Sequence, residues 1–243
     1  MNFKHISAFV GLIASSALGF SVTPAQAFSF QNNTALGTCA GVPLENLGNS
    51  GVSAGPASCS TADGFTLTAS ATNPTAGGAK LTKKTFNNLT GVGVFNDSSA
   101  AGQGSQQEID FGETLTLGLS KASVLTNLDL AFLFPAGAVG DVLNEVAVIT
   151  GFLNGSSVAS INVTGTNAFN GFKSLLNPFG NLAVDKVTLT SPQEAGTSFR
   201  YSDYSIVAAT ASTKVPEPAT LAGLGLVGSA LFASRRRKSN KAC

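Results

Sequence analysis

Three carboxylates lie within six residues of one another in the segment QQEIDFGETLTL: Glu108, Asp110 and Glu113. Hard cations such as Ca²⁺ take roughly six to eight oxygen ligands, and carboxylates supply them. In a strand, the side chains of Glu108 and Asp110 would point to the same face. The segment could therefore form part of a calcium site, although it matches no EF-hand or repeat calcium motif. We favour a structural interpretation, in which these acids are solvated strand ends and turn caps.

Histidine chemistry is almost excluded, because His5 is the only histidine of the 243 residues. Beyond it, the chain cannot form a Ser-His-Asp or Cys-His catalytic group or a zinc site that needs imidazole. A carboxylate pair could still hydrolyse glycosides. However, the chain has no Trp and two Tyr, which leaves little for stacking on sugars. We expect no enzymatic activity, and no cofactor apart from possible calcium.

The segment KLTKK places Lys80, Lys83 and Lys84 on one short predicted strand. Such a group could contact an anionic polysaccharide. More often, lysines protect an exposed edge strand against pairing with another chain, and we favour that interpretation.

Short runs with period-two alternation predict the elements that must position these residues. Asn154-Gly155 between two such runs predicts a tight hairpin, since both turn positions need a positive φ. The pattern indicates an all-β fold, an antiparallel β-sandwich of jelly-roll type, with a short helix near 121–126 or 170–177. The predicted strands cover 65–70, 79–86, 91–95, 113–120, 125–134, 145–153, 157–164, 185–191 and 197–210.

The N-terminal segment has the three regions of a secretory signal peptide. Lys4 precedes an apolar stretch, and Ala25-Gln26-Ala27 is a small-x-small triplet. This order predicts cleavage after Ala27 and export of the remainder.

The C-terminal segment predicts a short membrane-spanning helix. The run 219–233 has fifteen residues and no charge, near the lower limit for a span, and Arg235, Arg236, Arg237 and Lys238 follow it. A cationic cluster stays on the cytoplasmic side and stops transfer. Before the run, Val215, Pro216, Glu217 and Pro218 cannot form regular helix, so Glu217 would lie in extended backbone at the outer face.

This tail resembles the PEP-CTERM sorting signal of exported bacterial proteins, through Pro216-Glu217-Pro218, the apolar run and the arginine block. The resemblance implies recognition by an exosortase, an integral-membrane peptidase, and a link to the exopolysaccharide matrix. An anchor that is never cut is the alternative. The segment AFSF after the predicted cleavage site is similar to exported cyanobacterial proteins with this tail. The implied domains are a signal peptide (1–27), a β-sandwich ectodomain (28–214), a sorting signal (215–238) and a cytoplasmic tail (239–243).

Export also bears on the three cysteines. Cys243 lies beyond the arginine block, which leaves Cys39 and Cys59 as a pair that would close a loop of about twenty residues. Disulfides persist in exported proteins, so we predict this bond, with two free buried thiols as the alternative.

Removal of both ends changes the charge balance. The full chain has 14 basic and 13 acidic residues, whereas the predicted ectodomain keeps 8 and 12, a net charge of about −4. An acidic domain has no electrostatic reason to bind nucleic acid. We expect a non-catalytic envelope or matrix protein, held at the membrane and then at the cell surface after processing. A carbohydrate-binding domain and a carboxylate-based hydrolase are the alternatives.

Overall fold

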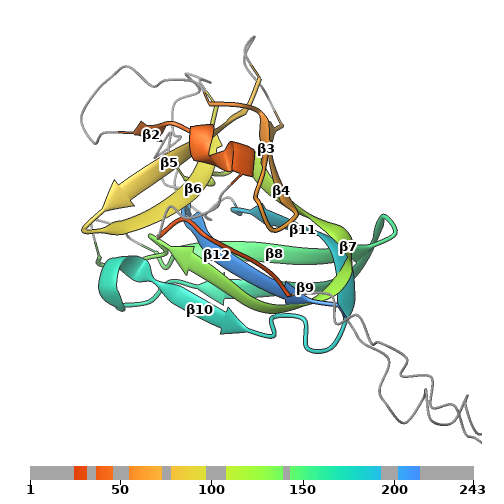
Figure 1. Ribbon diagram of the computed structural model, residues 1–243. Helices are drawn as coiled ribbons and strands as arrows, with labels where there is room; N and C mark the ends of the chain where they lie inside the picture. The colour runs from red at the N-terminus through yellow and green to blue at the C-terminus, as the bar shows by residue number, and fades with distance from the viewer. Residues whose placement is uncertain are drawn as a thin grey trace, which may run out of the picture.

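In the computed structural model the described part of the chain is a mostly antiparallel β-structure with two short 3₁₀ helices, and the all-β prediction is confirmed (Figure 1). The structure describes residues 25–31, 37–45, 55–72, 78–96, 108–138, 143–192 and 202–213. The elements are β1 (Gln26–Ser29), η1 (Gly37–Gly41), β2 (Leu44–Glu45), β3 (Ser58–Ser60), β4 (Phe65–Ala71), β5 (Lys80–Phe86), β6 (Leu89–Phe95), β7 (Glu113–Ala131), β8 (Val146–Leu153), β9 (Ser156–Thr164), η2 (Phe169–Gly171), β10 (Lys173–Leu176), β11 (Ala183–Thr190) and β12 (Ser205–Ser212).

The strand β7 organises the sheet, because each of its halves has different neighbours. Its first half pairs with β4 and most of β11, and its second half pairs with β12, β10 and the first two residues of β11. The pairing jumps from Gly118 opposite Lys186 to Ser123 opposite Val184, so the residues between bulge out and bend the strand. The prediction of two separate strands, with a possible helix at 121–126, is wrong here: a bulge turns the chain without breaking the strand.

The two halves of β7 share one hydrophobic core. Alternate residues of β4 and of the first half of β7 are buried, as the period-two pattern predicts. The ring of Phe28 on β1 lies 5.0 Å from that of Phe65 on β4, so strands on the two halves of β7 contact each other through side chains. Buried members of the core include Leu67, Leu81, Val92, Leu117, Val187 and Ile206.

Two local predictions are confirmed. Cys39 on η1 and Cys59 on β3 form a disulfide, with their Cα atoms 4.9 Å apart. Asn154 and Gly155 form the β8–β9 turn with φ values of +51° and +81°. Near 170–177, the predicted helix is a single 3₁₀ turn, η2, followed by the strand β10.

Most of the predicted N-terminal helix and all of the predicted C-terminal helix lie outside the described residues. Gln26 and Ala27, at the end of the predicted signal peptide, belong to the strand β1. Within the described ranges, no helix is long and apolar enough to cross a membrane.

Candidate functional site

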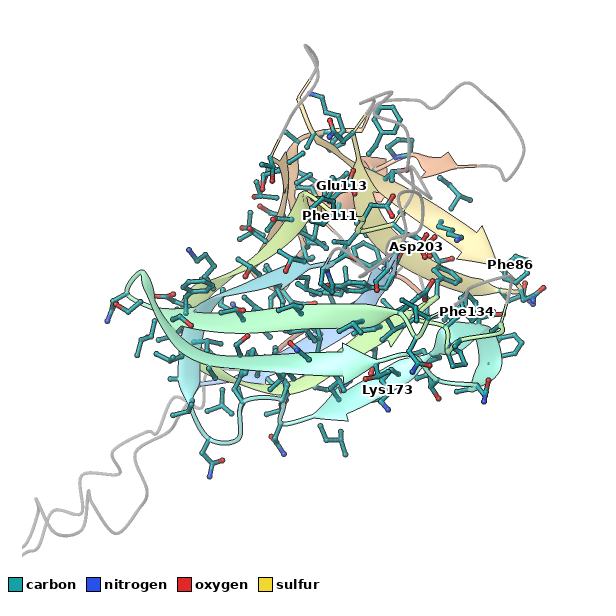
Figure 2. All side chains as sticks on the ribbon, turned by 180° about the vertical axis from the view of Figure 1, so that it is seen from behind. Phe86, Phe111, Glu113, Phe134, Lys173 and Asp203 are labelled. Atoms are coloured by element: carbon teal, nitrogen blue, oxygen red, sulfur yellow. A yellow bond between two sulfur atoms is a disulfide. The ribbon has the colours of Figure 1, made fainter. Side chains whose placement is uncertain are left out.

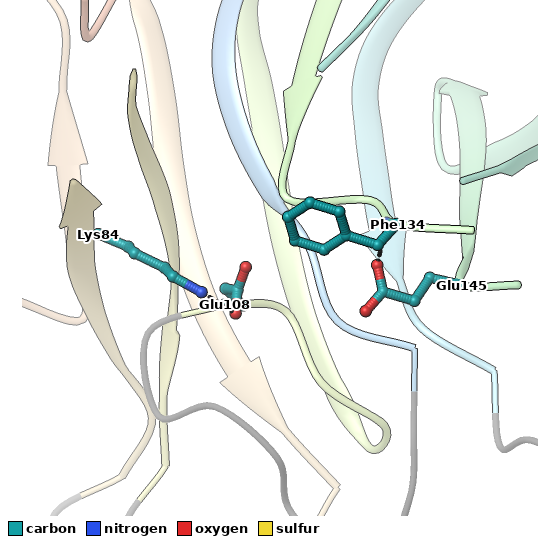
Figure 3. Close-up of polar contacts among 4 residues, drawn as sticks. All are labelled: Lys84, Glu108, Phe134 and Glu145. Carbon is teal, nitrogen blue, oxygen red and sulfur yellow. Dashed lines mark hydrogen bonds and ion pairs between the residues drawn. The ribbon is translucent and has the colours of Figure 1, made fainter. Parts of the chain in front are cut away.

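The segment 108–113 is fixed between β6 and the chain just before β12. The backbone N–H of Val94 donates to the carbonyl of Glu108, and that of Ile109 donates to the carbonyl of Tyr204. The Glu108 side chain is 2% exposed, and its Oε2 lies 2.6 Å from Nζ of Lys84 on β5 (Figure 3). The same Nζ lies 4.7 Å from the ring centroid of Phe132. Lys84 therefore joins β5 to this segment through a partly buried ion pair, and to Phe132, just after β7, through an aromatic face.

Glu113 closes a turn with Asp110. Its Oε2 accepts a hydrogen bond of 2.9 Å from the backbone N–H of Asp110, and its own N–H donates to the Asp110 carbonyl. Gly112 between them has φ +81°, a conformation that favours glycine. Burial raises the pKa of Glu113 to about 8, although the hydrogen bond from Asp110 acts in the opposite direction. The turn-cap interpretation therefore holds for Glu113, but as a buried and not a solvated group.

Another buried carboxylate, Glu145, fixes the chain before β8. Its Oε2 accepts a hydrogen bond from the backbone N–H of Phe134, and its own N–H donates to the Phe134 carbonyl (Figure 3). Glu145 is 3% exposed. Like Glu113, Glu145 accepts a hydrogen bond from backbone. Its two bonds to Phe134 hold the chain after β7 against the chain before β8.

The described carboxylates do not converge on one point. Among the described residues, no group of three or more His, Cys, Asp or Glu side chains is arranged to hold a metal ion. Glu108 is paired with a lysine, and Glu113 closes a turn. Calcium at Glu108, Asp110 and Glu113 stays a prediction without support from this geometry.

The lysines of β5 do not protect an open edge, so that interpretation is wrong for Lys83 and Lys84. One edge of β5 pairs with β6 along its whole length. On the other edge, Lys83 and Lys84 pair with β2, and the N–H of Leu81 donates to the Pro56 carbonyl. Lys83 is buried, and this desolvation lowers its pKa.

A hollow of about 380 Å³ lies beside the start of β1, and the sequence gives no sign of it. Gln26 forms part of its wall, and its Nε2 donates to Oγ of Ser120 at 2.5 Å. Gln26 and Ala27 pair with Ala211 and Thr210 of β12. Cleavage after Ala27 would remove these two residues from β1, and the hollow would lose the part of its wall that Ala25 and Gln26 form. The lining residues are Ala25, Gln26, Ala62, Asp63, Gly64, Ser120 and Lys121.

The sorting tail begins directly after this fold. The last described residue, Thr213, follows the final residue of β12. Residues 214–238 match the PEP-CTERM protein-sorting motif. The match covers Val215, Pro216, Glu217, Pro218 and the cluster Arg235 to Lys238, which all lie outside the described residues. It implies export, a membrane-anchored sorting signal at the C-terminus and processing by exosortase, a membrane protein.

The other comparisons add little. No curated protein matches the chain. One similar solved structure is the catalytic unit of a thermostable GH87 α-1,3-glucanase from Streptomyces thermodiastaticus strain HF3-3, at 14% identity and a TM-score of 0.28. The match covers 63% of this chain and 28% of the glucanase. A likeness this distant carries no argument about activity.

Proposed function

We propose that this protein is an exported, non-catalytic surface module that an exosortase sorts to the cell envelope or extracellular matrix. The observation that carries the proposal is the sorting motif at 214–238, which begins two residues after the last strand of the folded domain. The disulfide between Cys39 and Cys59 agrees with export, because such bonds persist in oxidising compartments.

We also propose a two-layer β-sandwich for the ectodomain. The contact between Phe28 and Phe65 supports it, since each ring comes from a strand on a different half of β7. A bulged strand that takes part in two layers is a known way to turn a sheet corner.

Two observations support the non-catalytic part of the proposal. The only histidine, His5, lies in the predicted signal peptide. The buried carboxylates Glu108, Glu113 and Glu145 are each no more than 3% exposed. Glu108 is ion-paired with Lys84, and Glu113 and Glu145 each accept a hydrogen bond from backbone. A substrate in solution would not reach them.

Replacement of Pro216, Glu217 and Pro218 by alanine tests the sorting role. Membrane insertion should be unaffected, because the apolar run and the arginines are unchanged, whereas release of the ectodomain should be lost. The measurement is the mass and location of the protein in a host with its own exosortase. The matched control replaces Ser239, Asn240 and Lys241, beyond the basic cluster, and should be processed normally. A triple-alanine variant released like the wild type would contradict the proposal.

Carbohydrate binding is a second candidate, favoured by two exposed aromatic side chains. Phe86 is 41% exposed and Phe169 is 67% exposed. Their segments are joined, because Nδ2 of Asn170 donates to the Phe86 carbonyl and Nδ2 of Asn87 donates to Oδ1 of Asn170. Aromatic faces beside amides are suited to sugar rings.

A pull-down with exopolysaccharide, with and without calcium, tests this candidate. The double variant Phe86→Ala and Phe169→Ala should lose retention, whereas Leu44→Ala, an exposed apolar residue on β2, should not. Equal retention of the wild type, the double variant and Leu44→Ala would contradict carbohydrate binding at these two phenylalanines. Retention only in the presence of calcium would instead support the predicted calcium site at residues 108–113.

A further inference from the structure

The sorting tail leaves the domain at a defined end. β12 runs from Ser205, opposite Ala131 of β7, to Ser212, opposite Val124. At roughly 3.3 Å per residue these two levels are about 23 Å apart. We call the end near Ser212 the tail end and the end near Ser205 the far end. Figure 1 shows the bend of β7 and the β8–β9 turn at one end of the molecule, and the tip of the β5–β6 hairpin at the other.

The register places two exposed leucines at the tail end. Leu176, the last residue of β10, lies opposite Asn127 of β7, which also pairs with Thr210 of β12. Leu182 directly precedes Ala183, which lies opposite Val124. These leucines are 77% and 48% exposed, and Leu176 is the most exposed large apolar side chain of the described residues.

Charged residues at the tail end are of both signs. Lys121 lies in the exposed bend of β7. Nζ of Lys186 lies 4.3 Å from the ring centroid of Phe152, near the β8–β9 turn. Asp63 and Asp185 lie near them, and Asp185 accepts a hydrogen bond from the N–H of Asn154. The charges of these four described residues cancel, so their attraction to anionic lipid is weak and the leucines dominate this surface.

The tether is short. Five residues separate Thr213 from Ala219, where the predicted apolar run begins. At roughly 3.3–3.6 Å per residue, the chain can span at most about 22 Å between them. The head-group region occupies part of that distance, because the whole bilayer exceeds its hydrocarbon core by about 10–15 Å. The first strand also starts here, since Gln26 of β1 lies opposite Ala211, so the predicted signal peptide leaves from the same end.

We propose that the tail end of the ectodomain lies against the membrane surface while the sorting tail is intact, with Leu176 and Leu182 in the lipid head-group region. The occupant of this apolar surface is the lipid in which the protein's own tail is inserted. The inference rests on the proposed function, since it requires the tail to enter the membrane. The far end, with Phe86 and Phe134, then faces away from the cell (Figure 2).

Site-specific fluorescence quenching tests this orientation in the full chain. In a Cys243→Ser background, which keeps the disulfide, Leu176→Cys or Leu182→Cys carries an environment-sensitive dye. Phe169→Cys at the far end is the matched control, because Phe169 is also highly exposed. The proteins are reconstituted in phosphatidylcholine vesicles with a nitroxide on the lipid head group. We expect loss of most of the dye emission at 176 and 182 and little loss at 169.

The outcomes separate the inference from the proposed function. An alkaline wash of the same vesicles shows whether the tail is inserted. A chain that washes off would overturn both the proposed function and this inference. A chain that stays, with equal quenching at 169 and 176, would overturn the inference alone. The Leu182→Cys variant guards against a local effect of the dye at 176, and a lack of quenching at both leucine positions also counts against the orientation.

Discussion

At the scale of single residues, the ion pair of Lys84 and Glu108 should be sensitive to the loss of one partner. Glu108 is 2% exposed on its side chain and Lys84 16%, so removal of the lysine leaves a carboxylate in a poorly solvated site. We expect Lys84→Met to lower the free energy of unfolding by about 3 kcal/mol. The double variant Lys84→Met with Glu108→Gln should recover much of this loss. Denaturant unfolding of the ectodomain measures both, and an equal loss in the single and double variants would disprove the coupling.

Glu113 gives the protein a pH dependence of defined sign. Its pKa rises from 4.5 to about 8 on folding, so between these values the folded state binds more protons than the unfolded state. Stability therefore decreases as pH rises through this window, by as much as a few kcal/mol. Below this pH window Glu113 is protonated in both the folded and the unfolded state. Above it Glu113 is ionised in both states, and the full loss of stability has occurred.

Glu113→Gln should remove this dependence, because the amide stays neutral and its oxygen can still accept from the N–H of Asp110. Melting temperature against pH should be flatter in the variant, with its largest relative gain above pH 8. Asp63→Asn on the exposed β3–β4 turn is the control and should leave the profile unchanged. A Gln variant that keeps the wild-type slope would show that another group is responsible.

At the scale of elements, the junction between β9 and the segment after β7 has no spare volume. A Cβ at Gly165 would lie 1.9 Å from the Phe134 carbonyl oxygen, and the Gly165 N–H donates to the Glu145 carbonyl. Backbone must move to admit a methyl group, so we expect Gly165→Ala to destabilise the fold by about 3 kcal/mol.

Gly118→Ala is the matched control for this junction. A Cβ there would lie 3.7 Å from Cβ of Thr66, an ordinary contact. Thermal unfolding should show a large decrease in melting temperature for the first variant and a small change for the second. Similar melting temperatures for both would mean that the 134–135 segment yields easily.

At the scale of the whole molecule, the length of the tether decides how the domain meets the membrane. A flexible Gly/Ser insertion of n residues between Thr213 and Lys214 adds a mean reach of roughly 5–6 Å × √n. Quenching of the dye at position 176 should therefore fall as the insertion grows from six to eighteen residues. The same insertions after Lys238 lie beyond the basic cluster and should leave quenching unchanged. Constant quenching in both series would mean that the leucines, and not the tether, hold the domain on the lipid.

The sequence by itself determined the features that depend on neighbours along the chain. The alternation in 65–70 and 145–153 predicts strands that exist, because one face of each is buried. Asn154-Gly155 specifies a turn through its own φ preference. The sorting motif is a linear signal and needs no fold to be read. The disulfide followed from the redox compartment and the pairing of two cysteines.

Tertiary structure decided everything that depends on partners far apart in the sequence. The period-two pattern cannot show that 113–131 is one strand, because a bulge preserves alternation on either side while it changes the neighbours. The sequence suggests that Lys84 and Glu108 are surface charges, but the fold brings these positions, 24 residues apart, into a partly buried pair. Gln26 reads as part of a cleavage site, yet it pairs with Ala211 near the other end of the chain. These three features depend on burial and on pairing between distant residues, which cannot be predicted from local sequence composition.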